Sequence, residues 1–238
     1  MKQDNSTVAV IMARGGSKRV PRKNARPFLG RPMVAWPVAH AVASGLFSHI
    51  IISTDDREIA NTAIAFGAAM HGQRPAALSD DDANTADVLR YELECFKTRE
   101  GSLPDLCCCL YGTSALALPA VLRQGRDALQ EKNAEFLMAV IPYGHPIERA
   151  LYFDDFGMAQ YRQPEYVLMR TQDIQPSYHD SGMLYWFRPE AFFRYGGKSF
   201  VPLHKTAIVV SSRLAVDIDT EEDWELAETL AARHNLDG

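Results

Sequence analysis

The chain has 238 residues and a formal net charge of −5, with 47% hydrophobic and 23% charged residues. This composition predicts one globular domain with room for an insert, and it excludes a disordered or collagen-like chain. The apolar runs are much shorter than the roughly 18–20 residues of a membrane-spanning helix, so we expect no membrane partner. The first residues, Met1–Ser6, are polar and do not resemble a signal peptide.

Three of the four cysteines are consecutive, at Cys107, Cys108 and Cys109. Such a run does not form a disulfide framework, and neighbours on one strand cannot all bind one metal ion. We therefore expect a reducing compartment, the cytoplasm, and no zinc site.

The basic residues are concentrated in one short segment. Seven lysines and arginines lie between Arg14 and Arg31 with no acidic residue, which leaves 18 basic and 30 acidic residues elsewhere. A basic island in an acidic chain favours a small anionic ligand over a nucleic acid, although a solvated loop would give the same pattern.

Apolar runs of strand length alternate with helical patterns in the first part of the chain. Strands are expected at Thr7–Met12, His49–Ser53, Leu106–Tyr111 and Glu135–Ile141. Helices are expected at Pro32–Ser44, Arg57–Phe66, Asn84–Lys97 and Pro119–Lys132. Pro37 should distort the first turns of its helix. The alternation predicts an α/β fold with a mainly parallel sheet flanked by helices.

From Pro142 the pattern changes. Residues 143–188 are rich in Tyr, Pro, Gln and Asp and have no clean helical period. We interpret them as an insert of strands and loops within a single domain, residues 1–238. Its aromatic residues would form either a second core layer or an exposed association surface.

The loop after the first expected strand has the composition of a phosphate site. In Ala13-Arg14-Gly15-Gly16-Ser17-Lys18, the glycines would let backbone N–H groups approach phosphate oxygens. Lys18 and Lys23 could join Arg14 in neutralising the phosphates. The spacing matches neither a Walker A loop nor Gly-x-Gly-x-x-Gly, so a plain turn is the alternative.

A second candidate site lies near the end of the chain. Strands are expected at Ala207–Val210 and Leu214–Asp217, and a terminal helix at Thr220–Arg233 with a capping box of Thr220 and Asp223. Asp217 and Asp219 are two residues apart, so on a strand they would present two carboxylates to one Mg²⁺ ion. Helix capping by Asp219 beside a surface Asp217 is the alternative.

Several motifs resemble those of the cytidylyltransferases that activate nonulosonic, sialic-type acids. They are Ile11-Met12-Ala13-Arg14-Gly15-Gly16-Ser17-Lys18-Arg19-Val20-Pro21-Arg22-Lys23-Asn24, Ser53-Thr54-Asp55-Asp56, Arg74-Pro75 and residues 217–224. In the insert, Gln163-Pro164-Glu165-Tyr166, Arg170-Thr171-Gln172-Asp173, Tyr178-His179-Asp180-Ser181-Gly182 and Tyr185-Trp186 are similar to the branch that uses pseudaminic acid.

The resemblance implies a Rossmann-like fold, of the nucleotide-diphospho-sugar transferase type, with a β-rich dimerisation insert and a Mg²⁺-dependent homodimer. The implied reaction transfers CMP from CTP to the anomeric hydroxyl of pseudaminic acid and releases pyrophosphate. Arg14, Lys23, Asp217 and Asp219 would be catalytic, and the two aspartates would hold the metal. The nucleotide would contact Ala13, Arg14, Gly15, Gly16, Ser17, Lys18, Lys23, Asn24, Arg74 and Thr85. The sugar acid would contact Tyr111, Gln163, Tyr166, Arg170, Gln172, His179 and Asp180.

The segment Tyr111–Ala117 departs from the family pattern. It lacks the usual proline, and Ala117 stands where sialic-type relatives have an arginine. Three alternatives therefore stay open: cytidylyl transfer to N-acetylneuraminate, legionaminate or Kdo, a glycosyltransferase of the Asp-x-Asp type, and a non-catalytic nucleotide-binding homologue.

Overall fold

The computed structural model describes residues 6–80 and 83–233. The strands are β1 (Thr7–Met12), β2 (Pro27–Phe28), β3 (Arg31–Pro32), β4 (His49–Ser53), β5 (Leu106–Tyr111), β6 (Phe136–Pro142), β7 (Leu151–Phe153), β8 (Ala159–Tyr161), β9 (Tyr178–Phe187) and β10 (Lys205–Val209). The α-helices are α1 (Ala35–Ser44), α2 (Arg57–Ala65), α3 (Thr85–Glu100), α4 (Pro119–Glu131), α5 (Pro189–Arg194) and α6 (Glu221–Ala232). Short 3-10 helices lie at η1 (Ala76–Leu78), η2 (Ile147–Arg149), η3 (Pro164–Tyr166) and η4 (Thr171–Asp173).

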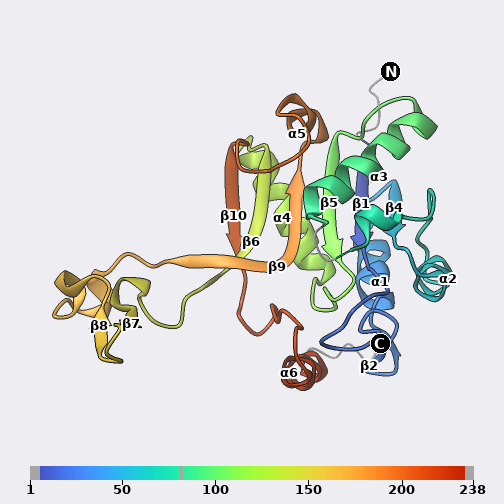
Figure 1. Ribbon diagram of the computed structural model, residues 1–238. Helices are drawn as coiled ribbons and strands as arrows, with labels where there is room; N and C mark the ends of the chain where they lie inside the picture. The colour runs from blue at the N-terminus through green and yellow to red at the C-terminus, as the bar shows by residue number, and fades with distance from the viewer. Residues whose placement is uncertain (1–5, 81–82, 234–238) are drawn as a thin grey trace.

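The central sheet has the strand order β10-β6-β9-β5-β1-β4 (Figure 1). β9 runs antiparallel to β5 and β6, whereas the other neighbouring strands are parallel. The predicted mainly parallel α/β fold is therefore confirmed. From β1 the chain passes to β4 on one side, and β5 then returns to the other side of β1. The strand order reverses between β1 and β5, which is where open α/β sheets bind ligands.

The sheet is covered on both faces, and side chains alternate between two cores. On β1, Ala9 and Ile11 pack with α1, α2 and α4, whereas Val8 and Val10 pack with α3 and α5. The consecutive cysteines follow the same period of two, because Cys108 joins the first core and its neighbours the second. Strands buried on both faces need apolar residues at every position, and they therefore appear in the sequence as continuous apolar runs.

The first helix begins later than expected. α1 starts at Ala35, and Pro32, the expected first helical residue, ends a small hairpin of β2 and β3 that was not expected. Pro37 falls in the first turn of the helix, where backbone N–H groups have no helical acceptor, so the expected distortion does not arise.

Two further expectations need correction. Leu214–Asp217 is not a strand: it is an irregular segment whose apolar residues pack against the core beside α6. The insert was expected to continue to Arg188, but β9 (Tyr178–Phe187) belongs to the central sheet. Its first residues, Tyr178–Asp180, are exposed and pair only with β6. The part outside the body is therefore residues 143–177, here called the arm.

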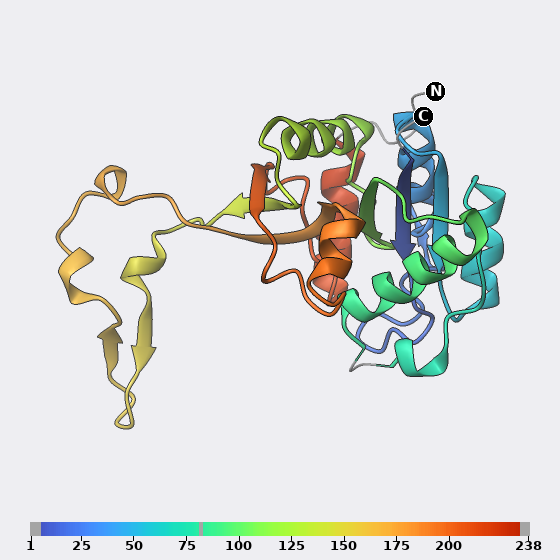
Figure 2. The same ribbon diagram turned by 90° about the horizontal axis from the view of Figure 1, so that it is seen from above.

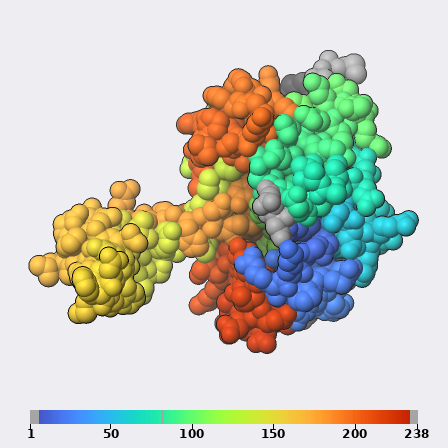
Figure 3. Space-filling view, in the orientation of Figure 1, coloured from blue at the N-terminus to red at the C-terminus, as the bar shows by residue number. Residues whose placement is uncertain are grey.

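The arm extends away from the body as a separate lobe (Figures 1, 2 and 3). It carries the two-stranded sheet of β7 and β8 and three of the short 3-10 helices. Within residues 6–80 and 83–233, no helix is both long and apolar enough to span a membrane.

Candidate active site

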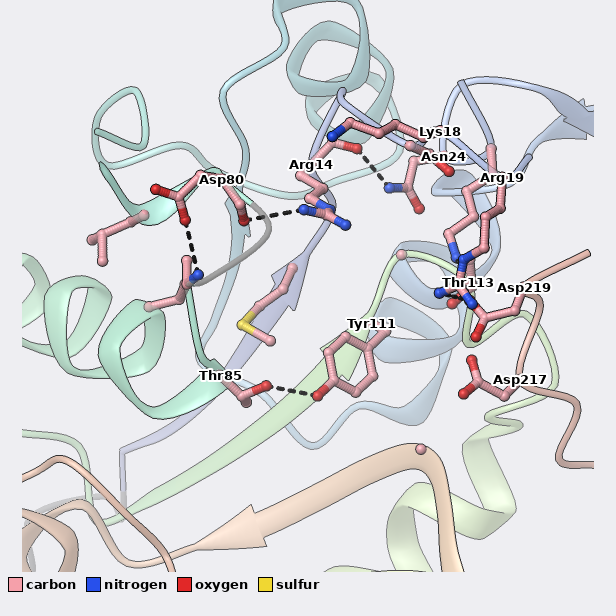
Figure 4. Close-up of a pocket in the computed structure, with 18 of the residues that line it drawn as sticks. Arg14, Lys18, Arg19, Asn24, Asp80, Thr85, Tyr111, Thr113, Asp217 and Asp219 are labelled. Carbon is pink, nitrogen blue, oxygen red and sulfur yellow. Dashed lines mark hydrogen bonds and ion pairs between the residues drawn. The ribbon is translucent and has the colours of Figure 1, made fainter. Parts of the chain in front are cut away.

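A cavity of about 840 Å³ opens at the carboxyl ends of β1 and β5. Met12 and Tyr111 end these strands and lie in its wall, and Figure 4 shows Tyr111 there. The basic loop after β1 forms one side, the start of α3 forms another, and the segment before α6 forms a third. The cavity thus lies at the reversal of strand order, as expected for a ligand site of an open α/β sheet.

The basic loop is held in place by its own polar contacts. The backbone N–H of Gly15 donates to Asp55 Oδ1 at 2.9 Å, and Asn24 Nδ2 donates to the carbonyl oxygen of Arg14 at 2.9 Å. Ser17 Oγ donates to the carbonyl oxygen of Val20 at 2.6 Å. These contacts fix the loop before any ligand binds.

The loop offers side chains to the cavity rather than the glycine backbone. Among the described residues of the loop, Arg14, Ser17, Lys18, Arg19, Lys23 and Asn24 line it, whereas Ala13, Gly15 and Gly16 do not. The expectation that the Gly15 N–H would face phosphate therefore differs from the structure, because Asp55 already accepts its hydrogen.

Two glycines allow close approaches around this loop. A Cβ on Gly15 would lie 2.8 Å from Asp56 Oδ2, and Asp56 is the N-cap of α2. A Cβ on Gly112 would lie 2.4 Å from Asn24 Oδ1. Because Gly112 has no side chain, the Asn24 amide can lie beside the cavity without a steric clash.

The acidic pair lies in the same cavity as the basic loop. Asp219 Oδ1 is 2.8 Å from Arg19 Nη2 and 3.7 Å from Lys23 Nζ, and Lys23 Nζ also donates to the carbonyl oxygen of Ile218 at 2.6 Å. Figure 4 shows Asp217 and Asp219 together, on the side toward which Arg19 points. The two clusters that the sequence analysis singled out separately therefore share one site.

Burial, followed by the charge of Asp219, raises the pKa of Asp217, while Lys23 and Arg19 oppose the rise. Two neighbouring carboxylates that repel each other form a donor set of oxygen atoms that suits Mg²⁺. In the described parts of the chain, no cluster of three or more His, Cys, Asp or Glu side chains could hold a metal ion. The pair would thus hold Mg²⁺ only together with oxygen atoms from substrate or water.

Helix α6 fixes the position of the acidic pair. Thr220 and Asp223 form the predicted capping box, which is confirmed. Arg26 contacts Glu221 at 2.7 and 2.9 Å and lies 4.3 Å from the ring centre of the buried Trp224. Phe28 packs edge-on against the same ring, at 5.4 Å between centroids. Arg26 therefore connects α6 to the basic loop through these contacts. It does not line the cavity.

Another wall of the cavity contains Arg74 and Thr85. Arg74 is almost fully buried, and its Nε donates to Ser53 Oγ at 3.0 Å. Thr85 Oγ1 and the hydroxyl of Tyr111 are 2.8 Å apart (Figure 4). Burial raises the pKa of Tyr111 to about 12, so this phenol is a neutral hydrogen-bonding group at physiological pH.

The expected sugar contacts are divided between two places. Tyr111 and Asp180 line the cavity. The Asp180 carboxylate accepts from Gly182 N and from the hydroxyl of Tyr185, each at 2.9 Å. Tyr185, from the quoted motif Tyr185-Trp186, also lines the cavity.

The other expected sugar contacts do not line the cavity within this chain. Gln163, Tyr166, Arg170 and Gln172 lie on the arm, and η3 and η4 include or adjoin them. His179 lies at the base of the arm, with its ring 4.8 Å from that of Tyr143. One chain thus brings together seven of the ten expected nucleotide residues but only two of the seven expected sugar contacts.

The match to a family model extends over nearly the whole chain: the model described as Cytidylyltransferase matches residues 8–234. The chain belongs to the cytidylyltransferase family. It is therefore an enzyme of the nucleotidyltransferase class.

Relatives and solved structures agree with this family. A pseudaminic acid cytidylyltransferase of Campylobacter jejuni is 34% identical over 224 residues, covering 94% of this chain and 95% of the relative. A CMP-N,N'-diacetyllegionaminic acid synthase of Legionella pneumophila is 29% identical over 230 residues, covering 94% and 95%. The structure of a CMP:2-keto-3-deoxy-manno-octonic acid synthetase complexed with CTP superposes with a TM-score of 0.69 at 18% identity, covering 96% and 99%, which supports the fold.

The unusual segment Tyr111–Ala117 is part of the cytidylyltransferase core. Ala115 and Ala117 are buried, and Ser114 Oγ donates to the carbonyl oxygen of Met183 at 2.7 Å. Only the beginning of the segment, as far as Thr113, borders the large cavity. The Ala117 side chain therefore packs in the core and does not face the cavity.

Proposed function

We propose that the protein transfers CMP from CTP to the anomeric hydroxyl of pseudaminic acid and releases pyrophosphate. The observation that carries the proposal is the meeting of Lys23 and Asp219, 3.7 Å apart, in one cavity at the ends of β1 and β5. A triphosphate with its Mg²⁺ ion needs cations for the phosphates and carboxylates for the metal in one place. The Campylobacter jejuni relative supports pseudaminic acid as the acceptor.

In this proposal, the basic side chains of the loop hold and neutralise the triphosphate. Arg14, Lys18 and Lys23 extend from a loop that is already fixed, so little reorganisation is needed when CTP binds. Lys23 is the candidate for stabilising the charge that develops on the transferred phosphoryl group. Ser17 and Asn24 supply polar contacts to the nucleotide.

Arg74 and Thr85 are proposed to bind the base and ribose. Both line the wall formed by the start of α3 and the segment before it, away from the acidic pair (Figure 4 shows Thr85). This assignment orients CTP with its phosphates toward the basic loop. The α-phosphorus would then lie between Lys23 and the acceptor end of the cavity.

The transfer itself forms one bond and breaks one. The anomeric oxygen of the sugar acid bonds to the α-phosphorus, the bond from the α-phosphorus to the bridging oxygen breaks, and pyrophosphate leaves with that electron pair. The hydroxyl proton passes to solvent. Positioning and charge neutralisation by the protein account for most of the rate in such a reaction.

Asp217 and Asp219 are proposed to hold Mg²⁺. When bound, Mg²⁺ would neutralise phosphate oxygens and so lower the barrier to phosphoryl transfer. The contacts of Asp219 with Arg19 and Lys23 keep this carboxylate at the cavity before the ion arrives. We further propose that the enzyme works in the cytoplasm, a setting that suits its four unpaired cysteines.

A homodimer is proposed to complete the acceptor end. The arm exposes a group of large apolar side chains: Leu151, Tyr152, Phe153, Phe156, Met158, Tyr161, Leu168 and Met169. So many exposed apolar side chains on one small lobe favour association. In a dimer, the arm of one copy could bring Gln163, Tyr166, Arg170, Gln172 and His179 to the cavity of the other, where Tyr111 and Asp180 already lie.

The test is incubation of the protein with CTP, Mg²⁺ and a panel of pseudaminic, legionaminic, N-acetylneuraminic and Kdo acids, with products identified by mass. We expect pyrophosphate and CMP-pseudaminic acid, with the other acids used much less well. A matched Asp217→Asn variant controls for contaminating activity. The Legionella pneumophila relative makes legionaminic acid the second candidate. Preferred turnover of that acid would overturn the assignment to pseudaminic acid but not cytidylyl transfer.

A further inference from the structure

An acidic side chain lies on the buried face of α3, where packing alone would favour an apolar residue. Glu92 is 1% exposed and lies among the apolar residues Val88, Leu89, Leu93 and Phe96. Burying a carboxylate is unfavourable unless partners compensate. One of its oxygens, Oε1, has no hydrogen-bond partner among the described residues. Glu92 is therefore poorly explained as a stabilising core residue.

The other partners of Glu92 lead to the cavity. Ser53, which is fully buried at the end of β4, lies close enough to Glu92 for its hydroxyl group to lower the pKa of the Glu92 carboxyl. Ser53 Oγ also accepts a hydrogen bond from Arg74 Nε at 3.0 Å. A hydroxyl group has a single hydrogen, and because Ser53 accepts from Arg74, that hydrogen remains for the Glu92 carboxylate. Ser53 thus adjoins both Arg74 and Glu92.

Contacts with Ser53 fix one edge of the Arg74 guanidinium group. Its Nη2 donates to the backbone oxygen of Ser53, while the backbone N–H of Arg74 donates to that of Thr54 at 3.0 Å. Arg74 lines the cavity, and in residues 6–80 and 83–233 its Nη1 has no hydrogen-bond acceptor. The opposite edge of the group is thus left for a ligand.

Burial raises the pKa of Glu92, and the hydrogen bond from Ser53 and the charge of Arg74 oppose the rise. Burial is also the main cause of the lowered pKa of Arg74, against which Glu92 and Asp55 act. Each group thus favours the charged form of the other, although no direct ion pair between them is present among the described contacts.

We propose that Glu92 is a positioning residue, which acts through Ser53 to hold the Arg74 guanidinium in the orientation that selects cytosine. This inference rests on the proposed function, which places Arg74 beside the base. An arginine side chain only donates hydrogen bonds. Cytosine presents two adjacent acceptors, O2 and N3, whereas N3 of uracil carries a hydrogen. A fixed Arg74 therefore favours CTP over UTP, and a mobile one discriminates less.

The experiment compares steady-state kinetics with CTP and with UTP, together with melting temperatures, for Glu92→Leu, Glu92→Gln and Ser53→Ala. Leu93→Val, on the same buried face, is the matched control for a disturbed core. We expect Glu92→Leu and Ser53→Ala to raise the KM for CTP about tenfold and to lower the CTP preference similarly, with a much smaller effect on kcat. Glu92→Gln keeps an acceptor for Ser53, so its effect should be smaller.

The control should lower the melting temperature and leave the KM for CTP and the nucleotide preference unchanged. An unchanged KM and preference in Glu92→Leu and Ser53→Ala would overturn the proposal. Equal changes in Leu93→Val would also overturn it, because they would assign the effect to the core in general. If Glu92→Leu does not fold, Ser53→Ala decides alone, since it leaves α3 intact.

Failure of the proposed function would look different. A wild type that releases no pyrophosphate from CTP with any acid of the panel would refute cytidylyl transfer. Calorimetric binding of CTP and UTP to the same variants would then decide on Glu92: a lost preference for CTP supports its role, and an unchanged one overturns it.

Discussion

The cavity and the arm differ in how far the side chains are buried and bonded within a single chain. The cavity is built from strand ends and loops whose polar side chains are buried and bonded, such as Arg74 at 6% exposure. The arm leaves Phe156 and Leu168 at 90% and 96% exposure, outside the body (Figure 2). The cavity is therefore preorganised within one chain, whereas the arm would be covered by a second chain in the proposed dimer.

The largest effect is expected at the acidic pair. Asp217→Asn and Asp219→Asn should each lower kcat by about 10²–10³, because phosphate charge is no longer neutralised in the transition state. Pyrophosphate release over a Mg²⁺ series measures this, with an increased Mg²⁺ requirement as the second sign. Normal turnover in either variant would remove that carboxylate from the proposed metal site.

Changes on the arm should act on the acceptor and leave CTP binding intact. Phe156→Ser and Leu168→Ser remove exposed apolar anchors, each with a cost of about 2 kcal/mol in dimer affinity. We expect monomers in sedimentation analysis and a KM for the sugar acid raised about tenfold or more, with an unchanged Kd for CTP.

Val201→Ser is the matched control for the arm, because Val201 is an exposed apolar residue of the body, at 78% exposure. It should leave the oligomeric state unchanged. If the arm variants remain dimeric and fully active, the contrast between the two regions is wrong.

A smaller effect is expected where α6 meets the basic loop. Arg26→Met removes both the contact with Glu221 and the cation–π contact with Trp224, which together contribute about 1–2 kcal/mol. The variant should melt at a lower temperature and need several-fold more Mg²⁺, because Asp219 directly precedes the cap of α6.

Arg126→Met serves as the control for the Arg26 change. Arg126 pairs only with its neighbour Asp127 among the described ion pairs, on the partly exposed surface of α4. Its loss should change stability by less than about 0.5 kcal/mol. Equal effects of the two substitutions would mean that Arg26 is an ordinary surface charge.

The smallest effect is on the stability of the metal-free protein. The pKa of Asp217 is raised in the folded state, so at neutral pH its ionised form destabilises the fold. Asp217→Asn should therefore raise the melting temperature slightly at pH 7 without Mg²⁺. The gain should shrink as the pH falls through the raised pKa and vanish below the ordinary pKa of aspartate. A gain that persists at low pH would contradict this origin.

Some of these features could be predicted from the sequence because the signal is local. The buried strands β1, β4 and β5 are continuous apolar runs, and the charge of the loop after β1 indicates an anionic ligand. Asp56, Asn84 and Thr220 cap their helices by side-chain contacts with residues two or three positions later. Short-range chemistry of this kind is visible in the printed sequence.

Other features depend on contacts between distant residues. β9 begins in solvent and ends in the core, so no single period describes it. The apolar residues of Leu214–Val216 could equally have been a strand, and only the packing of α6 decides otherwise. Glu92 had one visible signal, a carboxylate on the apolar face of a predicted helix, but its partners Ser53 and Arg74 come from other parts of the chain.

The central claim is that the basic loop and the acidic pair bind one CTP with its Mg²⁺ ion. The most direct test is calorimetric titration of CTP with and without Mg²⁺ into the wild type, Lys23→Ala and the Asp217→Asn/Asp219→Asn double variant. The account predicts that Mg²⁺ tightens CTP binding in the wild type, that the double variant loses this tightening but still binds CTP weakly, and that Lys23→Ala weakens binding in both conditions. Full Mg²⁺-dependent tightening in the double variant would contradict it.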